Sequence, residues 1–437
     1  MSRKPLDLVL LHAPSVYDFR KKAIMYGPIS DMIPSSPVFE MYPIGFLTLT
    51  AYLEARGLRV RIVNLALRMM NDPKFDVPKF LAGLNTKAFG IDLHWLPHAH
   101  GSLEVAKLCK EIHPQVPVIF GGLSATYFHN ELIQYSQVDY VLRGDSTEPS
   151  THKLLTAIGQ GDSLAQIPNL TWMVEDEIQE NPFTYIPTSL DYVDIMPNRL
   201  VRMVLRHRDL QSVIPFNGWW KNPITAVLTA KGCAHGCVTC GGSNSSCELI
   251  SKRDHPIFRS PENLVKNIKD ISRLSRGPIF LVGDLRQTAD EYGVQVLEIL
   301  STANIKNEIV FEFFGMPPSE FLQAIDRSVK NWSIELSPES HDSAVRHVQD
   351  DAVFYTNQEM ENVIQEAMTL RCNRVDMFFM IGLPQQTTES VMQTIDYCEH
   401  IFEISDQRVS CFISPMGHFL DPGSRGFEEP EKYGYRL

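Results

Sequence analysis

Short apolar runs alternate with amphipathic stretches over the first 160 residues. Strand-like runs fall at 7–13, 59–65, 88–94, 117–121 and 138–142. Helix-like stretches fall at 44–56, 101–112, 129–135 and 150–158. The strand-like runs are nearly continuously apolar, as expected when helices cover both faces of a parallel sheet. The alternation predicts one doubly wound α/β domain over residues 1–160.

This rhythm breaks between residues 161 and 222, which we assign to a linker. The sequence TWMVEDEIQENP predicts a small hairpin around an acidic turn. Irregular, proline-containing chain follows and ends in an aromatic stretch, 216–220, which we expect to pack at the domain interface.

A second alternation of strands and helices follows the linker. Strand-like runs fall at 224–230, 278–283, 308–314, 331–336, 374–381 and 408–414. Helix-like stretches fall at 260–274, 291–303, 318–329, 358–371 and 388–404. Six strands separated by helices predict a partial (β/α)6 barrel over residues 223–420, with a polar tail at 421–437. In such barrels the chemistry lies at the carboxyl ends of the strands.

Charge and apolar content narrow the possible partners. The formal net charge is −12, which argues against a general nucleic-acid-binding protein. The sequence has no apolar run of 18 residues and no visible N-terminal signal, so we expect a cytoplasmic protein without a membrane span. In that reducing compartment the eight cysteines are not expected to form disulfides.

Three cysteines lie close together directly after the first strand of the barrel. Cys233, Cys237 and Cys240 have spacings of four and three residues, so one short glycine-containing loop can wrap three thiolates around one centre. A four-iron cluster normally takes four cysteines, and three would leave one iron open to another ligand. A structural zinc site is the alternative, with His235 or Cys247 as its fourth ligand.

The CxxxCxxC spacing at this position resembles the signature of the radical S-adenosylmethionine (SAM) superfamily. The resemblance implies a [4Fe–4S] cluster on the three cysteines, with SAM bound to the open iron. By position it also implies SAM contacts from residues at strand ends: Asp284, Ser337, Glu339 and Gly382. One departure is Thr239, where the superfamily usually has an aromatic residue. Cys247 stays open as a spare thiol or as a ligand to a second centre.

The first domain resembles the Rossmann-like cobalamin-binding domain that precedes many radical SAM domains. The matching marks include Gly121-Gly122 after the fourth strand and Arg143-Gly144-Asp145 after the fifth. The resemblance implies cobalamin contacts from the first of these loops: Gly121, Gly122, Ser124 and Thr126. An ordinary tight turn is the alternative for the two glycines.

A histidine-rich stretch follows the third strand. Cobalamin proteins with a histidine below the cobalt carry Asp-x-His-x-x-Gly after the first strand, whereas here Asp92 and His94 follow the third strand and Pro97 replaces the glycine. The resemblance therefore implies cobalamin bound without a protein histidine ligand. Whether His94 faces the corrin stays open, and we expect His98 and His100 on a solvated helix start.

The combined architecture resembles class B radical SAM methylases. That family implies a 5′-deoxyadenosyl radical, made from SAM, that activates an unactivated carbon of the substrate, and methylcobalamin as the methyl donor. It further implies a small-molecule or peptide substrate and an external one-electron reductant of the flavodoxin or ferredoxin type. Related enzymes often continue into a C-terminal substrate domain. The alternatives are a cyclase or rearrangement enzyme with the same cofactors, a radical SAM enzyme without cobalamin, and a non-enzymatic zinc protein.

Overall fold

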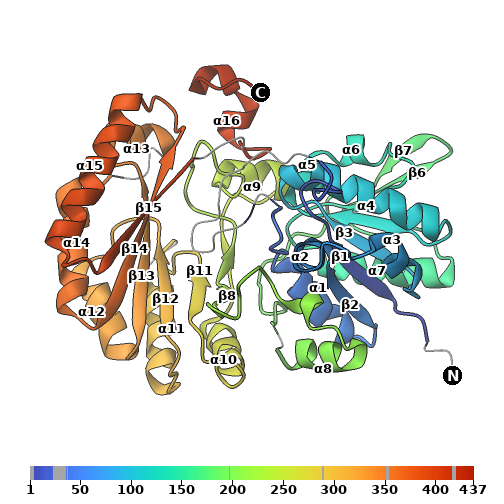
Figure 1. The fold of residues 1–437 in the computed structure, drawn as a ribbon, viewed down its shortest axis with the longest axis horizontal. Coiled ribbons are helices and arrows are strands. Elements are labelled where there is room, and N and C mark those ends of the chain that lie inside the picture. Colours follow the sequence, from blue (N-terminus) through green and yellow to red (C-terminus); the bar gives the residue numbers. More distant parts are fainter. Residues whose placement is uncertain are drawn as a thin grey trace.

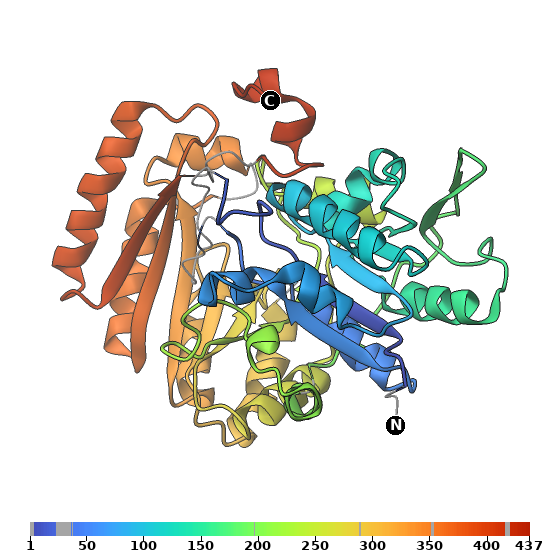
Figure 2. The ribbon, with the colours of Figure 1, turned by 45° about the vertical axis from the view of Figure 1, so that its right-hand side comes forward.

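Two mainly parallel sheets, each covered by helices, make up the fold (Figure 1). The computed structural model describes residues 4–22, 36, 38–195, 197–287, 290–350, 354–415 and 420–437. In the described residues the first sheet has seven strands and the second has six, and a separate antiparallel pair, β9 (Ala230–Lys231) and β10 (Ile257–Phe258), lies between the first and second strands of the second sheet in sequence. The carboxyl-terminal segment lies over the junction between the two sheets in both views (Figures 1 and 2).

The first sheet has the strand order β2-β1-β3-β4-β5-β6-β7. Its strands are β1 (Leu8–His12), β2 (Val60–Asn64), β3 (Phe89–Asp92), β4 (Val118–Gly121), β5 (Tyr140–Leu142), β6 (Leu170–Val174) and β7 (Glu177–Glu180). The first five are parallel, which confirms the predicted doubly wound α/β fold. Their order reverses between β1 and β3, and ligands of such sheets bind beyond the carboxyl ends of the strands at that point.

The predicted hairpin exists, but it extends the first sheet. β6 pairs antiparallel with β5, and β7 pairs with β6. The hairpin covers the edge that β5 would otherwise expose. The linker assigned from the sequence therefore begins with two strands that belong structurally to the first sheet.

Helices cover both faces of the first sheet. They are α1 (Gly45–Glu54), α2 (Leu65–Asn71), α3 (Val77–Ala82), η1 (Leu96–His98), α4 (Ala99–Ile112), α5 (Leu123–Tyr127), α6 (His129–Leu132) and α7 (Glu148–Gln160). Helices α2 and α3 were not predicted because seven and six residues are too few to show a helical period. Their start signals were present, since the Asn64 and Asp76 side chains accept hydrogen bonds from the first turns of α2 and α3.

The predicted irregular chain before the barrel contains a helix, α8 (Pro197–His207), and a short 3-10 turn, η2 (Gln211–Val213). The prediction was wrong here because proline was counted as a breaker, although it is favoured in the first turn of a helix. Of the aromatic stretch, Phe216 is buried, whereas Trp220 is exposed.

The second sheet confirms the predicted partial barrel. Its parallel strands are β8 (Thr225–Leu228), β11 (Ile279–Val282), β12 (Ile309–Phe313), β13 (Trp332–Glu339), β14 (Cys372–Ile381) and β15 (Val409–Pro415). They lie in sequence order, with β8 and β15 at the two edges of the sheet in the described part of the chain. The helices on its outer side are α10 (Pro261–Ser272), α11 (Asp290–Thr302), α12 (Ser319–Ser328), α14 (Asn357–Thr369) and α15 (Thr388–Ile404).

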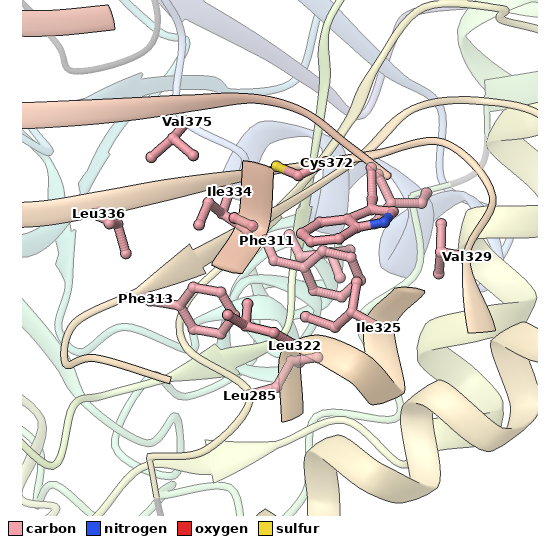
Figure 3. Packing of buried hydrophobic residues seen from close by; sticks show 14 of the residues in the cluster. Leu285, Phe311, Phe313, Leu322, Ile325, Val329, Ile334, Leu336, Cys372 and Val375 are labelled. Atoms are coloured by element: carbon pink, nitrogen blue, oxygen red, sulfur yellow. The ribbon is translucent and has the colours of Figure 1, made fainter. Parts of the chain in front are cut away.

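The barrel core lies between the strands and these outer helices (Figure 3). Phe311 and Phe313 of β12 and Ile334 of β13 pack there with Leu322 and Ile325 of α12. Because side chains alternate along a strand, residues 312 and 335 point to the opposite face, into the barrel. The apolar face thus anchors the sheet and leaves the inner face to polar groups.

Candidate functional site

The cysteine loop connects the first barrel strand to a helix. After β8 the chain forms β9 (Ala230–Lys231), passes through the three cysteines and enters α9 (Asn244–Ser251). The Ser243 side chain caps α9 by accepting a hydrogen bond from the Ser246 backbone N–H. Gly232 has φ +86°, a conformation that side chains with a Cβ rarely adopt. The structure therefore places all three cysteines at the carboxyl end of β8, as predicted.

Two of the three sulfurs accept backbone hydrogen bonds. The His235 N–H donates to Cys233 Sγ at 3.4 Å, and the Gly242 N–H donates to Cys240 Sγ at 3.3 Å. Such bonds stabilise thiolates in iron–sulfur sites and tune their potentials. Burial raises the pKa of Cys233 to about 11 despite the His235 N–H, and burial also raises the pKa of Cys237. A bound metal is therefore needed to hold these groups as thiolates at neutral pH.

The fit to a cluster rests on this donor set. In the part of the chain that the structure describes, no three His, Cys, Asp or Glu side chains converge closely enough to hold a metal ion. All eight cysteines are free, so none of the three is consumed by a disulfide. Three free thiols on one short loop, two of which accept backbone N–H bonds, have the ligand chemistry of an iron–sulfur cluster that leaves one iron open, although they do not converge on a single metal ion in the described structure.

The end of α13 (Ser343–Gln349) supports one side of the cysteine loop. Val238 N–H donates to the Gln349 carbonyl at 2.8 Å, and the Gln349 side-chain amide donates to Thr239 Oγ1 at 2.6 Å. Asp350 pairs with His235 at 2.8 Å. Thr239, which departs from the usual aromatic residue, therefore positions the loop through its hydroxyl group.

The carboxyl-terminal tail supports the other side of the loop. The Gly241 N–H donates to Asp421 Oδ2 at 2.9 Å, and the Gly426 N–H donates to the Val238 carbonyl at 2.8 Å. A Cβ on Gly241 would lie 2.6 Å from the Asp421 Cβ, so a glycine is required there. The predicted polar tail is thus part of the site. Sequence reasoning missed this role because a contact across 180 residues leaves no local pattern.

Carboxyl groups inside the barrel form a row that the sequence analysis did not identify. Glu312, Glu335 and Asp376 lie side by side in the register of β12, β13 and β14. Glu335 is 1% exposed, and burial raises the pKa of Asp376 although Arg374 pairs with it. The available signal was a charged residue in the middle of each apolar run, in EIVFEFF, NWSIEL and RVDMFFMI.

The residues predicted to bind SAM lie at the ends of three barrel strands. The Glu339 charge, after burial, contributes to the raised pKa of Cys237, so this carboxyl group lies near the cysteine loop. Ser337 is half-buried on the same strand. Gly382 has φ +103°, and its carbonyl accepts a hydrogen bond from the Tyr435 hydroxyl group at 2.9 Å. Their roles as SAM contacts stay predictions.

Asp284, the fourth of these residues, is already engaged within the chain. It is buried, and both carboxylate oxygens accept hydrogen bonds from Arg286, at 2.7 and 3.1 Å. The Phe314 N–H donates to it at 3.2 Å. In the described structure Asp284 therefore joins the end of β11 to the end of β12, and a SAM contact from it stays a prediction.

The residues predicted to bind cobalamin gather at the carboxyl edge of the first sheet. Gly122 has φ +117°, and a Cβ there would lie 2.7 Å from the backbone nitrogen of His94. Ser124 donates to the His94 carbonyl at 3.1 Å, and Thr126 accepts from the Gly144 N–H at 2.8 Å. A Cβ on Gly121 would meet nothing closer than 3.8 Å. Gly122, Ser124 and Thr126 thus tie the loops after β3, β4 and β5 together, and their cobalamin contacts stay predictions.

Two buried histidines, His12 at the end of β1 and His98 in η1 after β3, lie at the carboxyl edge of the first sheet. His12 bonds Asp92 through Nδ1 at 3.0 Å and the Phe39 carbonyl through Nε2 at 2.9 Å. Both partners accept, so His12 carries two protons; its pKa is raised because Asp92 and Phe39 outweigh the effect of burial. His98 also contacts the Phe39 carbonyl and is fully buried, so the prediction of a solvated His98 is wrong. His100 is exposed, as predicted.

The loop after β5 meets the cysteine loop. Arg253, 2% exposed at its side chain, pairs with the Asp145 carboxylate. Lys231, two residues before Cys233, donates to the Asp145 carbonyl at 2.5 Å and to Ser146 Oγ at 3.2 Å. Burial alone would raise the pKa of Asp145, but Lys231 and Arg253 outweigh it and lower the pKa. These contacts hold the carboxyl edge of the first sheet against the cysteine loop.

Comparison with known protein families agrees with this division of the chain. Residues 33–152 match the family model of the B12 binding domain, and residues 227–398 match that of the radical SAM superfamily. The chain carries a B12-binding domain followed by a radical SAM domain. The radical SAM domain implies a [4Fe–4S] cluster and SAM, and the B12-binding domain implies cobalamin.

Known proteins similar to this chain include a methylase and two radical SAM enzymes. The hopanoid C-3 methylase of Methylococcus capsulatus is 21% identical over 65% of this chain, and the match spans 50% of that relative. The radical SAM methyltransferase TsrM of Kitasatospora setae, with cobalamin and a [4Fe–4S] cluster bound, matches with a TM-score of 0.69 and 16% identity, over 98% of this chain and 75% of TsrM. The cobalamin-dependent SAM radical enzyme OxsB matches with a TM-score of 0.64 and 13% identity, over 98% of this chain and 62% of OxsB. The chain spans about half the length of its curated relative, and the structural matches establish the fold.

We predict that Gly122→Ala destabilises the B12-binding domain by about 1–3 kcal/mol, since the new Cβ meets backbone at a positive φ. Thermal unfolding of the full chain measures the effect. Gly121→Ala is the matched control, because its Cβ makes only ordinary contacts. Equal unfolding midpoints for the two variants would contradict the prediction.

We predict that Asp145→Asn destabilises the chain by about 3 kcal/mol, because Arg253 then stays buried without its counter-ion. The wild-type contribution comes from a lowered folded pKa, so it is present above the unfolded aspartate pKa of about 4 and is lost as pH falls through the folded value. Unfolding at pH 7 and pH 3 measures both effects.

The control for this prediction is Asp270→Asn, which removes ion pairs with the exposed side chains of Lys266 and Arg273. Exposed pairs contribute little, so its midpoint at pH 7 should equal that of the wild type. If Asp145→Asn behaved in the same way, the buried pair would have no role in stability.

Proposed function

We propose that this chain is a cobalamin-dependent radical SAM methyltransferase that acts on an unactivated carbon of a small-molecule or peptide substrate. The observation that carries the proposal is the contact of Asp145 with Arg253 and Lys231, which holds the B12-binding edge against the cysteine loop. Two cofactors can act on one substrate only if their sites share a cavity or face one another. The curated hopanoid C-3 methylase and the methyltransferase TsrM support the reaction class.

When bound, the cofactors supply the radical chemistry and the methyl group, and the protein supplies position and exclusion of water. Cys233, Cys237 and Cys240 hold the cluster, and Thr239 and Gly241 fix the loop against α13 and the tail. Asp284, Ser337, Glu339 and Gly382 contact SAM in this proposal. The carboxyl row of β12, β13 and β14 favours a cation, and SAM carries a sulfonium centre.

On the cobalamin side, Gly121, Gly122, Ser124 and Thr126 line the corrin site in this proposal. His12 is held by Asp92 and the Phe39 carbonyl, so both of its nitrogens are occupied and it is not a cobalt ligand. An external one-electron reductant of the flavodoxin or ferredoxin type serves the cluster. We propose the predicted division into a B12-binding domain at 1–160, a linker at 161–222, a barrel at 223–420 and a tail at 421–437, with the hairpin β6–β7 of the linker paired to the first sheet.

The described structure has no helix that is both long and apolar enough to cross a bilayer. We keep the cytoplasm as the proposed location.

We predict that anaerobic reconstitution with iron and sulfide loads about four irons per chain, as a [4Fe–4S] cluster requires. Cys237→Ala should lose most of the iron and the brown absorption of the cluster, because two thiolates cannot hold it. Cys411→Ser, which changes a half-buried thiol on β15, should load like the wild type. The iron content of the Cys247→Ser variant decides the role of that residue: wild-type loading would make Cys247 a spare thiol, and lower loading would make it a ligand.

The same sample should bind one hydroxocobalamin per chain after desalting, measured as cobalt and by absorption. With a candidate substrate, SAM and reductant, the product should gain the mass of one CH2 unit. Unchanged mass with a new ring would favour the cyclase or rearrangement alternative, and iron without cobalt would remove the cobalamin mechanism. Zinc in place of iron would contradict the proposal.

A further inference from the structure

The outer face of α8 exposes two aliphatic side chains side by side. Val201 is 48% exposed and Leu205 is 73% exposed, and they lie one turn apart on the same side of the helix. The opposite side of α8 is anchored, since Met203 is buried in the core of the B12-binding domain and Leu200 packs there with α1. The exposure of Val201 and Leu205 is therefore a property of a folded helix.

Cationic side chains border this apolar pair. Arg202 and Arg206, also one turn apart, are exposed next to it, and exposed Arg208 and Leu210 follow directly after the helix. Between residues 197 and 222 the only acidic residue is Asp209, which is buried and paired with Arg61 and Arg68. Residues 197–222 therefore contribute no exposed carboxylate to the outer face of α8, although the whole chain has a net charge of −12.

We propose that this face, defined by Val201, Arg202, Leu205 and Arg206, docks the protein on an anionic lipid surface. Exposed apolar side chains beside arginines are the arrangement by which amphipathic helices lie in a membrane interface: the apolar groups enter the acyl boundary and the guanidinium groups stay with lipid phosphates. The charge is complementary to an anionic leaflet and opposite to the charge of the rest of the chain.

The geometry also sets how α8 meets the membrane. Its 11 residues are too few to span a bilayer, so the helix lies in the plane of the surface. In Figure 1, α8 lies at the lower edge of the molecule, whereas α9 and α16 (Arg425–Glu428), which flank the cysteine loop, lie in its upper half. Docking through α8 therefore leaves the cysteine loop uncovered, and the inference does not depend on the proposed reaction.

The test is sedimentation of the reconstituted full chain with two kinds of vesicle at low salt. One is an equal mixture of phosphatidylglycerol and phosphatidylcholine, and the other is phosphatidylcholine alone. The wild type should bind the mixed vesicles and not the neutral ones, and binding should weaken as salt is raised. Leu205→Glu should weaken binding about tenfold or more, because one leucine leaves the interface and a like charge enters.

A second pair of variants separates charge from folding. Arg202→Glu/Arg206→Glu should weaken binding to mixed vesicles about tenfold or more, whereas Arg202→Lys/Arg206→Lys should bind like the wild type. Met392→Glu is the matched control, since Met392 is 54% exposed on α15 of the barrel, and it should bind like the wild type. All variants should keep the wild-type unfolding midpoint, because every changed side chain is exposed.

Three results would overturn the inference. The first is equal binding to neutral and anionic vesicles, or no binding to either. The second is a Leu205→Glu variant that binds mixed vesicles like the wild type. The third is a concentration-dependent dimer that Leu205→Glu abolishes without any vesicle binding, which would assign the face to a second copy of this chain.

Discussion

The buried contact between Asp145 and Arg253 is the interaction on which the rest of the site depends. It is made where the carboxyl edge of the first sheet meets the segment that carries the three cysteines. Each sheet has its own core, so the sheets could fold as separate units. The ion pair and Lys231 join the two sheets at the edges that build the site, and that site exists only while the edges stay together.

The conformation of the cysteine loop depends on contacts with neighbouring segments. Its conformation is supported by backbone hydrogen bonds to α13 on one side and to residues 421–426 on the other. Gly241 is required by a neighbour from the tail, and Gly232 by its own backbone conformation. The loop is therefore held from outside, which leaves the sulfur atoms to be directed by the metal.

Local sequence patterns predicted most of the fold. Alternating apolar runs predicted all five parallel strands of the first sheet and all six of the barrel, because buried parallel strands leave continuous apolar sequence. They failed at α8, which begins at a proline, and at short helices that include α2, α3, α5, α9 and α13. The three cysteines could be found because their spacing is local. The tail contact and buried His98 could not, since each depends on residues far apart in sequence. The carboxyl row was missed although each of its three apolar runs carries a charged residue in its middle.

The tail contact has a consequence for how the protein is made. Gly241 meets Asp421, which lies 180 positions later in the chain, beyond nearly the whole barrel. Chain emerging from a ribosome completes its amino-terminal parts first. The cysteines are thus synthesised well before the residues that support one side of their loop. This side of the loop is supported only once residues 421–426 have been translated, so the surroundings of the cysteines are completed after the barrel strands have been made.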